Sequence, residues 1–116
     1  MTGMSASEAT GRGNRPAPEH THPDQVALET ALAALADPVR LGIVRELAGS
    51  ADWSRTCGSL DVPIGKAALS HHLGVLRAAG ILEQRDAGTK RVNRLRRAEF
   101  DRRFPGLLDL ALRERA

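Results

Sequence analysis

The chain has 116 residues, enough for one modest core but with little room for a deep catalytic cavity as well. Its formal net charge is only +3, yet residues 1–64 carry five Lys and Arg against eight Asp and Glu, whereas residues 65–116 carry twelve against six. One cysteine excludes an intramolecular disulfide framework, no apolar run is long enough to cross a bilayer, and the N-terminus lacks the apolar core of a signal peptide. We expect a cytoplasmic protein with no membrane contact, whose C-terminal half binds a polyanion or presents a solvated basic surface.

The chain is expected to begin with a tail. Residues 1–23 are rich in Gly, Ser, Thr, Pro and Asn and offer almost nothing to bury, so they predict a disordered N-terminal segment, followed by one folded domain over residues 24–116. His20 and His22 could hold a soft metal ion, but a flexible segment does not preorganise a site. We therefore expect no metal there.

Two helices are expected next. From residue 24 onward, apolar side chains recur at helical spacing: Leu28, Ala31, Leu32 and Leu35. Asp37 and Pro38 begin a second helix, because Asp is a favourable N-cap and Pro fits the first helical turn. Its buried face holds Val39, Ile43, Val44 and Leu47. Gly49 is expected to end this helix.

Residues 50–64 keep no helical period and predict at most one short helix, around residues 56–60. Cys57 in this segment is either a small buried hydrophobic residue or a redox sensor, which requires an exposed thiol with a depressed pKa. Trp53 is expected to anchor the core or an interface.

A third helix is predicted over residues 66–79, closed by Gly80. At about 100° per residue, its apolar side is formed by Leu69, Leu73 and Leu76, with His72 at the edge. The opposite face is small and polar and carries Ala67, Ser70, His71, Gly74 and Ala78. Such a face can enter the major groove of DNA, with Lys66 and Arg77 flanking it near phosphates, although many helices with this composition simply face solvent.

A β-hairpin follows this helix. Residues 81–85 and 91–95 predict two strands, joined by a turn over residues 86–89 in which Gly88 supplies a positive φ. Lys90 and Arg91 make its tip basic. A helix followed directly by a basic hairpin is the order of a recognition helix and its wing, which favours the DNA-binding interpretation.

The last element is an apolar stripe at steps of four and three, formed by Phe100, Phe104, Leu107, Leu108 and Ala111. Because the stripe crosses Pro105 and Gly106, it predicts one kinked helix or two short ones.

Two segments resemble the ArsR-type winged helix-turn-helix repressors. ALADPVRLGIVRELA, from Ala34 to Ala48, is similar to that family's second helix, and KAALSHHLGVLRAAGILEQRDAGTKRVNRL, from Lys66 to Leu95, is similar to its recognition helix and wing. The resemblance implies a mainly α fold with about five helices and a two-stranded wing. It also implies a homodimer, built from the first and last helices, that binds an inverted-repeat operator and blocks transcription until an effector releases it.

The arrangement of side chains around the predicted helix of residues 66–79 and the family resemblance together assign two sets of residues. The predicted DNA-binding residues are Lys66, Ala67, Ala68, Ser70, His71, Arg77, Lys90 and Arg91, with the wing at residues 86–91. The predicted dimer interface consists of Leu28, Leu32, Leu35, Phe104, Leu107, Leu108 and Ala111. A chain this short also gains stability by pairing, which agrees with a homodimer.

The usual effector sites of the family are incomplete. Many relatives bind metals through a cysteine pair before the recognition helix or through Asp and His on the last helix, whereas this chain has the single Cys57 and no His or Cys in residues 100–116. His71 and His72 lie about 100° apart on a helix and cannot readily close on one ion. We predict no metal and no cofactor.

The sequence therefore predicts a transcriptional regulator that binds double-stranded DNA. A general nucleic-acid or RNA-binding module is the alternative, but single-strand binders depend on aromatic stacking and this chain has no Tyr, two Phe and one Trp. A protein-interaction module that uses the final stripe is a further alternative. An enzyme is disfavoured, because no nucleophile constellation, phosphate-binding Gly loop or paired carboxylates are apparent.

Overall fold

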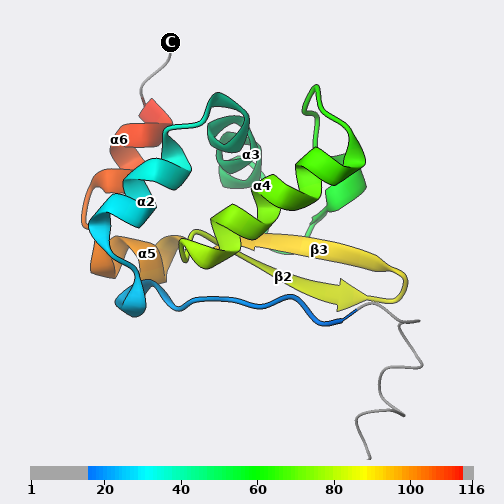
Figure 1. The fold of residues 1–116 in the computed structure, drawn as a ribbon, viewed down its shortest axis with the longest axis horizontal. Coiled ribbons are helices and arrows are strands. Elements are labelled where there is room, and N and C mark those ends of the chain that lie inside the picture. The colour runs from blue at the N-terminus through cyan, green and yellow to red at the C-terminus, as the bar shows by residue number, and fades with distance from the viewer. Residues whose placement is uncertain (1–15, 114–116) are drawn as a thin grey trace, which may run out of the picture.

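The computed structural model describes residues 16–113, in which five α-helices accompany a small antiparallel sheet (Figure 1). The elements in order are η1 (Pro23–Gln25), α2 (Leu28–Leu35), α3 (Pro38–Ala48), β1 (Arg55–Thr56), η2 (Cys57–Ser59), α4 (Lys66–Ala78), β2 (Leu82–Ala87), β3 (Lys90–Leu95), α5 (Arg97–Arg103) and α6 (Leu107–Arg113). Helices α2, α5 and α6 gather at one end, α4 crosses the molecule, and the hairpin of β2 and β3 runs below α4, away from α5 (Figure 1).

Helix α2 buries only part of the apolar set that the sequence places on one face. Its buried residues are Ala31, Ala34 and Leu35, whereas Leu28 and Leu32 keep 50% and 46% of their surfaces exposed. The helix is also shorter than its apolar period suggested, because Pro23–Gln25 forms a separate 3-10 turn before it. Leu28 and Leu32, both predicted for a dimer interface, therefore lie on the surface of the protomer.

Helix α3 begins and ends where the sequence predicts. Asp37 Oδ1 accepts hydrogen bonds from the backbone N–H groups of Val39 and Arg40 at 2.8 and 3.0 Å. The bond from Arg40, above all, holds the pKa of Asp37 below its ordinary value. The helix ends at Ala48 and is capped by Gly49, so both predicted boundaries are confirmed.

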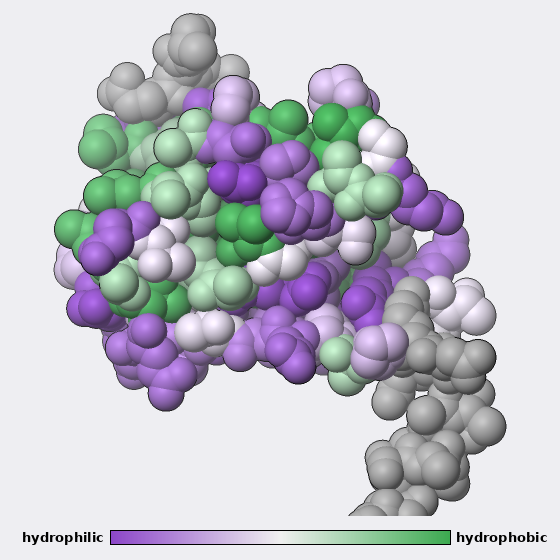
Figure 2. Space-filling view, viewed as in Figure 1, coloured by the Kyte–Doolittle hydropathy of each residue, from purple (hydrophilic) through white to green (hydrophobic). Residues whose placement is uncertain are grey.

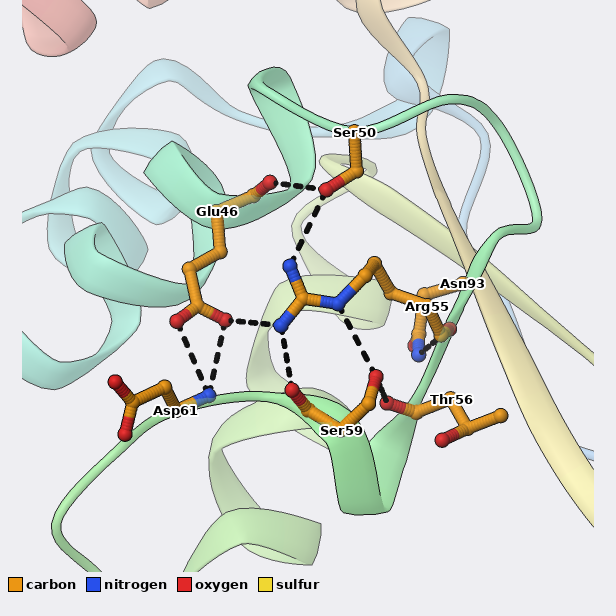
Figure 3. Close-up of polar contacts among 7 residues, drawn as sticks. All are labelled: Glu46, Ser50, Arg55, Thr56, Ser59, Asp61 and Asn93. Atoms are coloured by element: carbon orange, nitrogen blue, oxygen red, sulfur yellow. Dashed lines mark hydrogen bonds and ion pairs between the residues drawn. The ribbon is translucent and has the colours of Figure 1, made fainter.

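A polar cluster fixes the long connection between α3 and α4 (Figure 3). The Arg55 guanidinium forms an ion pair with Glu46 at 3.0 Å and donates to the carbonyl and hydroxyl oxygens of Ser59. The same Glu46 carboxylate accepts from the Asp61 N–H with both oxygens at 3.0 Å. One carboxylate on α3 therefore organises a loop whose only helical turn, among the described residues, is the 3-10 turn Cys57–Ser59, near the predicted position.

The sheet has three strands in the order β1-β3-β2, one more than the sequence predicts. Strands β2 and β3 pair from Leu82↔Leu95 to Ala87↔Lys90, which leaves a turn of two residues instead of the expected four. Gly88 in this turn has φ +66°, as predicted. Strand β1 adds two residues to the far edge of β3 and so ties the loop after α3 to the hairpin.

The C-terminal stripe forms two short helices, which is one of the two expected arrangements. Phe104 ends α5, and Gly106 takes φ +83° before α6. Phe100 and Leu108 are fully buried and close the core against α2 and α3.

The segment before α2 differs from the expected tail. Residues 1–15 lie outside the described residues, but residues 16–23 run beside β2 (Figure 1). The N–H of Thr21 donates to the Arg77 carbonyl at 3.3 Å, the N–H of Gln84 donates to His20 Nε2 at 2.9 Å, and Pro23 is buried. Composition indicated little to bury, but here backbone groups and one imidazole supply the contacts. For residues 16–23 the expectation of disorder is therefore corrected.

Substituting Gly80 with Ala should destabilise the fold. Gly80 has φ +72°, and a Cβ there would lie 3.0 Å from Pro23 Cα, so Ala adds both backbone strain and a collision with the N-terminal segment. We expect Gly80→Ala to lower the free energy of unfolding by about 1–3 kcal/mol, measured by urea denaturation.

Gly42→Ala is the matched control, since Gly42 lies inside α3 with open space around its Cα. It should leave stability unchanged or raise it by up to about 1 kcal/mol. Equal effects of the two substitutions would contradict the close approach of Pro23 to Gly80.

Candidate nucleic-acid interface

The outward face of α4 has the composition and exposure that the helical wheel predicts. Leu73 and Leu76 are buried, and Leu69 packs against the core. The exposed residues of the first two turns are Lys66, Ala67, Ala68, Ser70 and His71. No side chain caps the N-terminus of α4, because its N-cap is Gly65. Small side chains and free amide groups therefore lie together at the start of this helix, an arrangement that suits close approach to phosphate and base edges.

The two neighbouring histidines of α4 have different surroundings. His71 is exposed. His72 is half-buried, and its Nδ1 accepts a hydrogen bond from Arg40 Nη1 at 3.0 Å. Because Arg40 Nε also donates to the Ala34 carbonyl at 2.8 Å, this pair ties α4 to α3 and α2. His72 thus lies toward the protein interior and His71 outside, as the wheel indicates.

The wing presents one free cation. Lys90, the first residue of β3, is exposed, and within residues 16–113 neither it nor Lys66 has a hydrogen-bond or ion-pair partner. Arg91, in contrast, pairs with Asp86 at 2.9 Å and donates to the Pro16 carbonyl. The predicted wing-tip pair is therefore divided into a free lysine and an arginine that is already engaged.

Arg77 does not flank the outer face of α4 as predicted. Its guanidinium donates to Gln84 Oε1 on β2 and, at 3.0 Å, to the Glu19 carbonyl. Burial lowers the pKa of Arg77, and the charge of Arg91 acts in the same direction. The long side chain reaches an acceptor near the interior, which corrects its expected place beside DNA phosphates.

Beneath the wing lies a buried amide pair that sequence reasoning missed. Gln84 and Asn93, exposed by only 3% and 1%, face each other across β2 and β3, and Gln84 Nε2 donates to Asn93 Oδ1 at 2.9 Å. Asn93 Nδ2 donates to the Arg55 carbonyl on β1 at 2.9 Å. The available signal was strand alternation, because Gln84 lies two residues after Leu82 and therefore points to the same face.

Cys57 fits neither of its two expected descriptions fully. It is half-buried, and its Sγ accepts a hydrogen bond from Gln84 Nε2 at 3.1 Å. The thiol is therefore part of the polar network below the wing.

The described residues supply no metal centre. Residues 16–113 contain no group of three or more His, Cys, Asp and Glu residues that could hold a metal ion. His20 accepts from the Gln84 N–H, and burial lowers the pKa of His20. His22 Nδ1 accepts from the Asp24 N–H at 3.1 Å and caps η1. Each imidazole thus has a structural partner of its own.

An apolar surface lies at the opposite end of the molecule, over α2 and α6 (Figure 2). Its exposed residues are Leu28, Leu32 and Leu110. Of the seven residues predicted for a dimer interface, Leu28 and Leu32 are exposed and Leu107 and Ala111 are partly buried. The other three, Leu35, Phe104 and Leu108, are buried within the protomer's own core. No helix within residues 16–113 has the length and apolar character needed to span a membrane.

Comparisons with known proteins agree with this architecture. Residues 35–85 match the model of a family described as a helix-turn-helix domain. A similar solved structure is that of the transcriptional repressor BigR from Xylella fastidiosa, with 26% sequence identity, a TM-score of 0.57, and coverage of 95% of this chain and 92% of that chain. No curated protein matches the chain with significant similarity. The mainly helical winged helix-turn-helix fold expected from the sequence is thus confirmed.

Replacing Gln84 with Leu should destabilise the wing. The substitution leaves Asn93 without its amide donor and Arg77 without its side-chain acceptor, both near the interior. We expect Gln84→Leu to lower the free energy of unfolding by about 1–3 kcal/mol in urea denaturation. Gln25→Leu, on an exposed 3-10 turn, is the matched control and should have little effect. If the Gln84→Leu variant unfolded at the same urea concentration as the wild type, the amide network would contribute nothing to stability.

Proposed function

We propose that this protein is a DNA-binding transcriptional regulator of the ArsR type that acts as a homodimeric repressor at an inverted-repeat operator. The observation that carries the proposal is the exposed, small and polar face of α4, which lies beside a wing whose free cation is Lys90. The similarity to a transcriptional repressor over most of both chains supports it.

In this proposal α4 is the recognition helix. Ala67 and Ala68 let its backbone approach the groove, while Ser70 and His71 reach base edges. Lys66 and Lys90 contact phosphates on either side, and such contacts supply affinity without reading sequence. Arg77 and Arg91 act differently from the sequence expectation, because their contacts within the chain position the wing.

The apolar surface over α2 and α6 is proposed as the dimer interface. Exposed leucines at Leu28, Leu32 and Leu110 would be covered by a second copy of the chain. Leu35, Phe104 and Leu108, which were also predicted for the interface, are buried in the protomer core and pack beneath this surface. A two-fold dimer presents its two recognition helices about 34 Å apart, one turn of B-DNA.

His71→Ala and Lys90→Ala should have different effects on DNA binding. If His71 reads a base, its loss costs about 1–3 kcal/mol on the operator and little on random duplex. Lys90→Ala should weaken both duplexes alike and reduce the slope of log K against log salt by about 1. Fluorescence anisotropy with duplex from the gene's own promoter, at several KCl concentrations, measures both effects.

Arg102→Ala, an exposed cation on α5, is the control and should leave both affinities unchanged. Equal losses of operator and random binding for His71→Ala would show that His71 contacts only the backbone. Tighter binding to single-stranded RNA than to duplex DNA would instead favour the general nucleic-acid module.

Leu32→Glu should convert a dimer into a monomer. Leu32 is exposed on this surface, and a carboxylate in its place would have to be desolvated in the interface. We expect sedimentation velocity to give a dimer for the wild type and a monomer for Leu32→Glu. Ala51→Glu, in the loop after α3, introduces the same charge elsewhere and should remain dimeric. A monomeric wild-type protein would contradict the proposed interface.

A further inference from the structure

A cavity of about 440 Å³ lies between η2, α4 and the hairpin. Its volume falls within the range of about 300–1,000 Å³ that is typical of small-molecule sites. Lys66 and Ser70 of α4 and Lys90 of the wing line it. These same residues belong to the proposed DNA-binding surface, so the cavity opens on the face that would meet DNA.

The cavity combines an apolar wall with uncompensated positive charge. Leu69 and Leu73 line it from α4, and none of its described lining residues is acidic. Lys66 and Lys90 have no partner within residues 16–113. The two lining arginines, in contrast, are held by Gln84 and Asp86. Two free ammonium groups therefore stand at an otherwise prearranged site.

We propose that this cavity binds a small organic anion with an apolar body, such as an aromatic carboxylate, and that its occupancy excludes DNA. The anionic group is held by the ammonium groups of Lys66 and Lys90, and the body lies against Leu69 and Leu73. The exclusion of DNA rests on the proposed function. It follows because the anion neutralises the same two lysines that would release counterions from the duplex.

A phosphodiester is a poorer occupant than an organic anion. It carries the charge that the lysines require, but it has no apolar body to cover Leu69 and Leu73. A neutral aromatic molecule would cover the leucines but would leave both lysines without a counter-charge. The combination of features thus selects an amphipathic anion.

The first experiment tests binding without DNA. The full chain, labelled with ¹⁵N, is titrated with 1-naphthoate, and amide shifts are followed by NMR. We expect saturable shifts at Gly58, Ser70 and Thr89, which line the cavity. Sodium acetate and 1-naphthamide, which lack the apolar body and the charge respectively, should bind at least about tenfold more weakly.

Two variants test the assigned residues. Lys66→Gln and Lys90→Gln should each weaken naphthoate binding about threefold to tenfold, whereas Arg102→Gln should not change it. Equal binding of naphthoate and naphthamide, shifts confined to α2 and α6, or no saturable shifts would overturn the proposal.

The second experiment tests exclusion. Naphthoate should lower the apparent affinity for duplex DNA in proportion to its occupancy of the cavity, while acetate at equal ionic strength should not. Unchanged duplex affinity at saturating naphthoate would overturn the exclusion of DNA. A chain that binds naphthoate but no duplex would overturn the proposed function and leave the anion site standing, so the two failures are distinguishable.

Discussion

The hydrogen bond between the buried side chains of Gln84 and Asn93 is the constraint on which the placement of the wing depends. Two almost fully buried amide side chains must find partners, because each unsatisfied polar group costs about 1–3 kcal/mol. The partners come from separate elements: the Arg55 carbonyl on β1, Cys57 on η2 and the Arg77 guanidinium on α4. Satisfying this one pair therefore fixes the hairpin relative to α4.

The order of the N-terminal segment follows from the same contacts. Once the Arg77 side chain is drawn to Gln84, its Nε is in position to bind the Glu19 carbonyl. The backbone of Gln84 in turn donates to His20. Gly80 permits Pro23 to approach the end of α4. A polar segment without a hydrophobic stripe is thus ordered by backbone groups, a kind of contact that composition does not reveal.

Local signals predicted the helices and the hairpin, whereas contacts between distant residues decided the rest. The Asp37 cap, the apolar side of α4 and the positive φ of Gly88 each depend on a few neighbouring residues. Strand β1 could not be predicted, because two residues carry no period and pair only where β3 offers an edge. Helical periodicity likewise places only the Cα of Arg77, whereas the direction of its long side chain depends on the contact with Gln84 on β2.

Ion pairs within the chain also decide which cations of residues 65–116 remain available for DNA phosphates. Arg94 lies between Glu83 and Glu99, at 2.8 and 2.7 Å. Although burial opposes ionisation of Glu99, the hydrogen bond from Arg94 helps to lower the pKa of that carboxyl to about 2.

Arg97 pairs with Asp109 in the same way, at 2.5 Å. The positive charge counted in the sequence is therefore largely used to join β2, β3, α5 and α6. Lys66 and Lys90 remain free on one face, beside both the outer surface of α4 and the cavity. Because an ammonium group is a mobile point charge, either lysine suits a phosphate or a carboxylate, so the proposed DNA contact and the proposed anion site would compete for the same two groups.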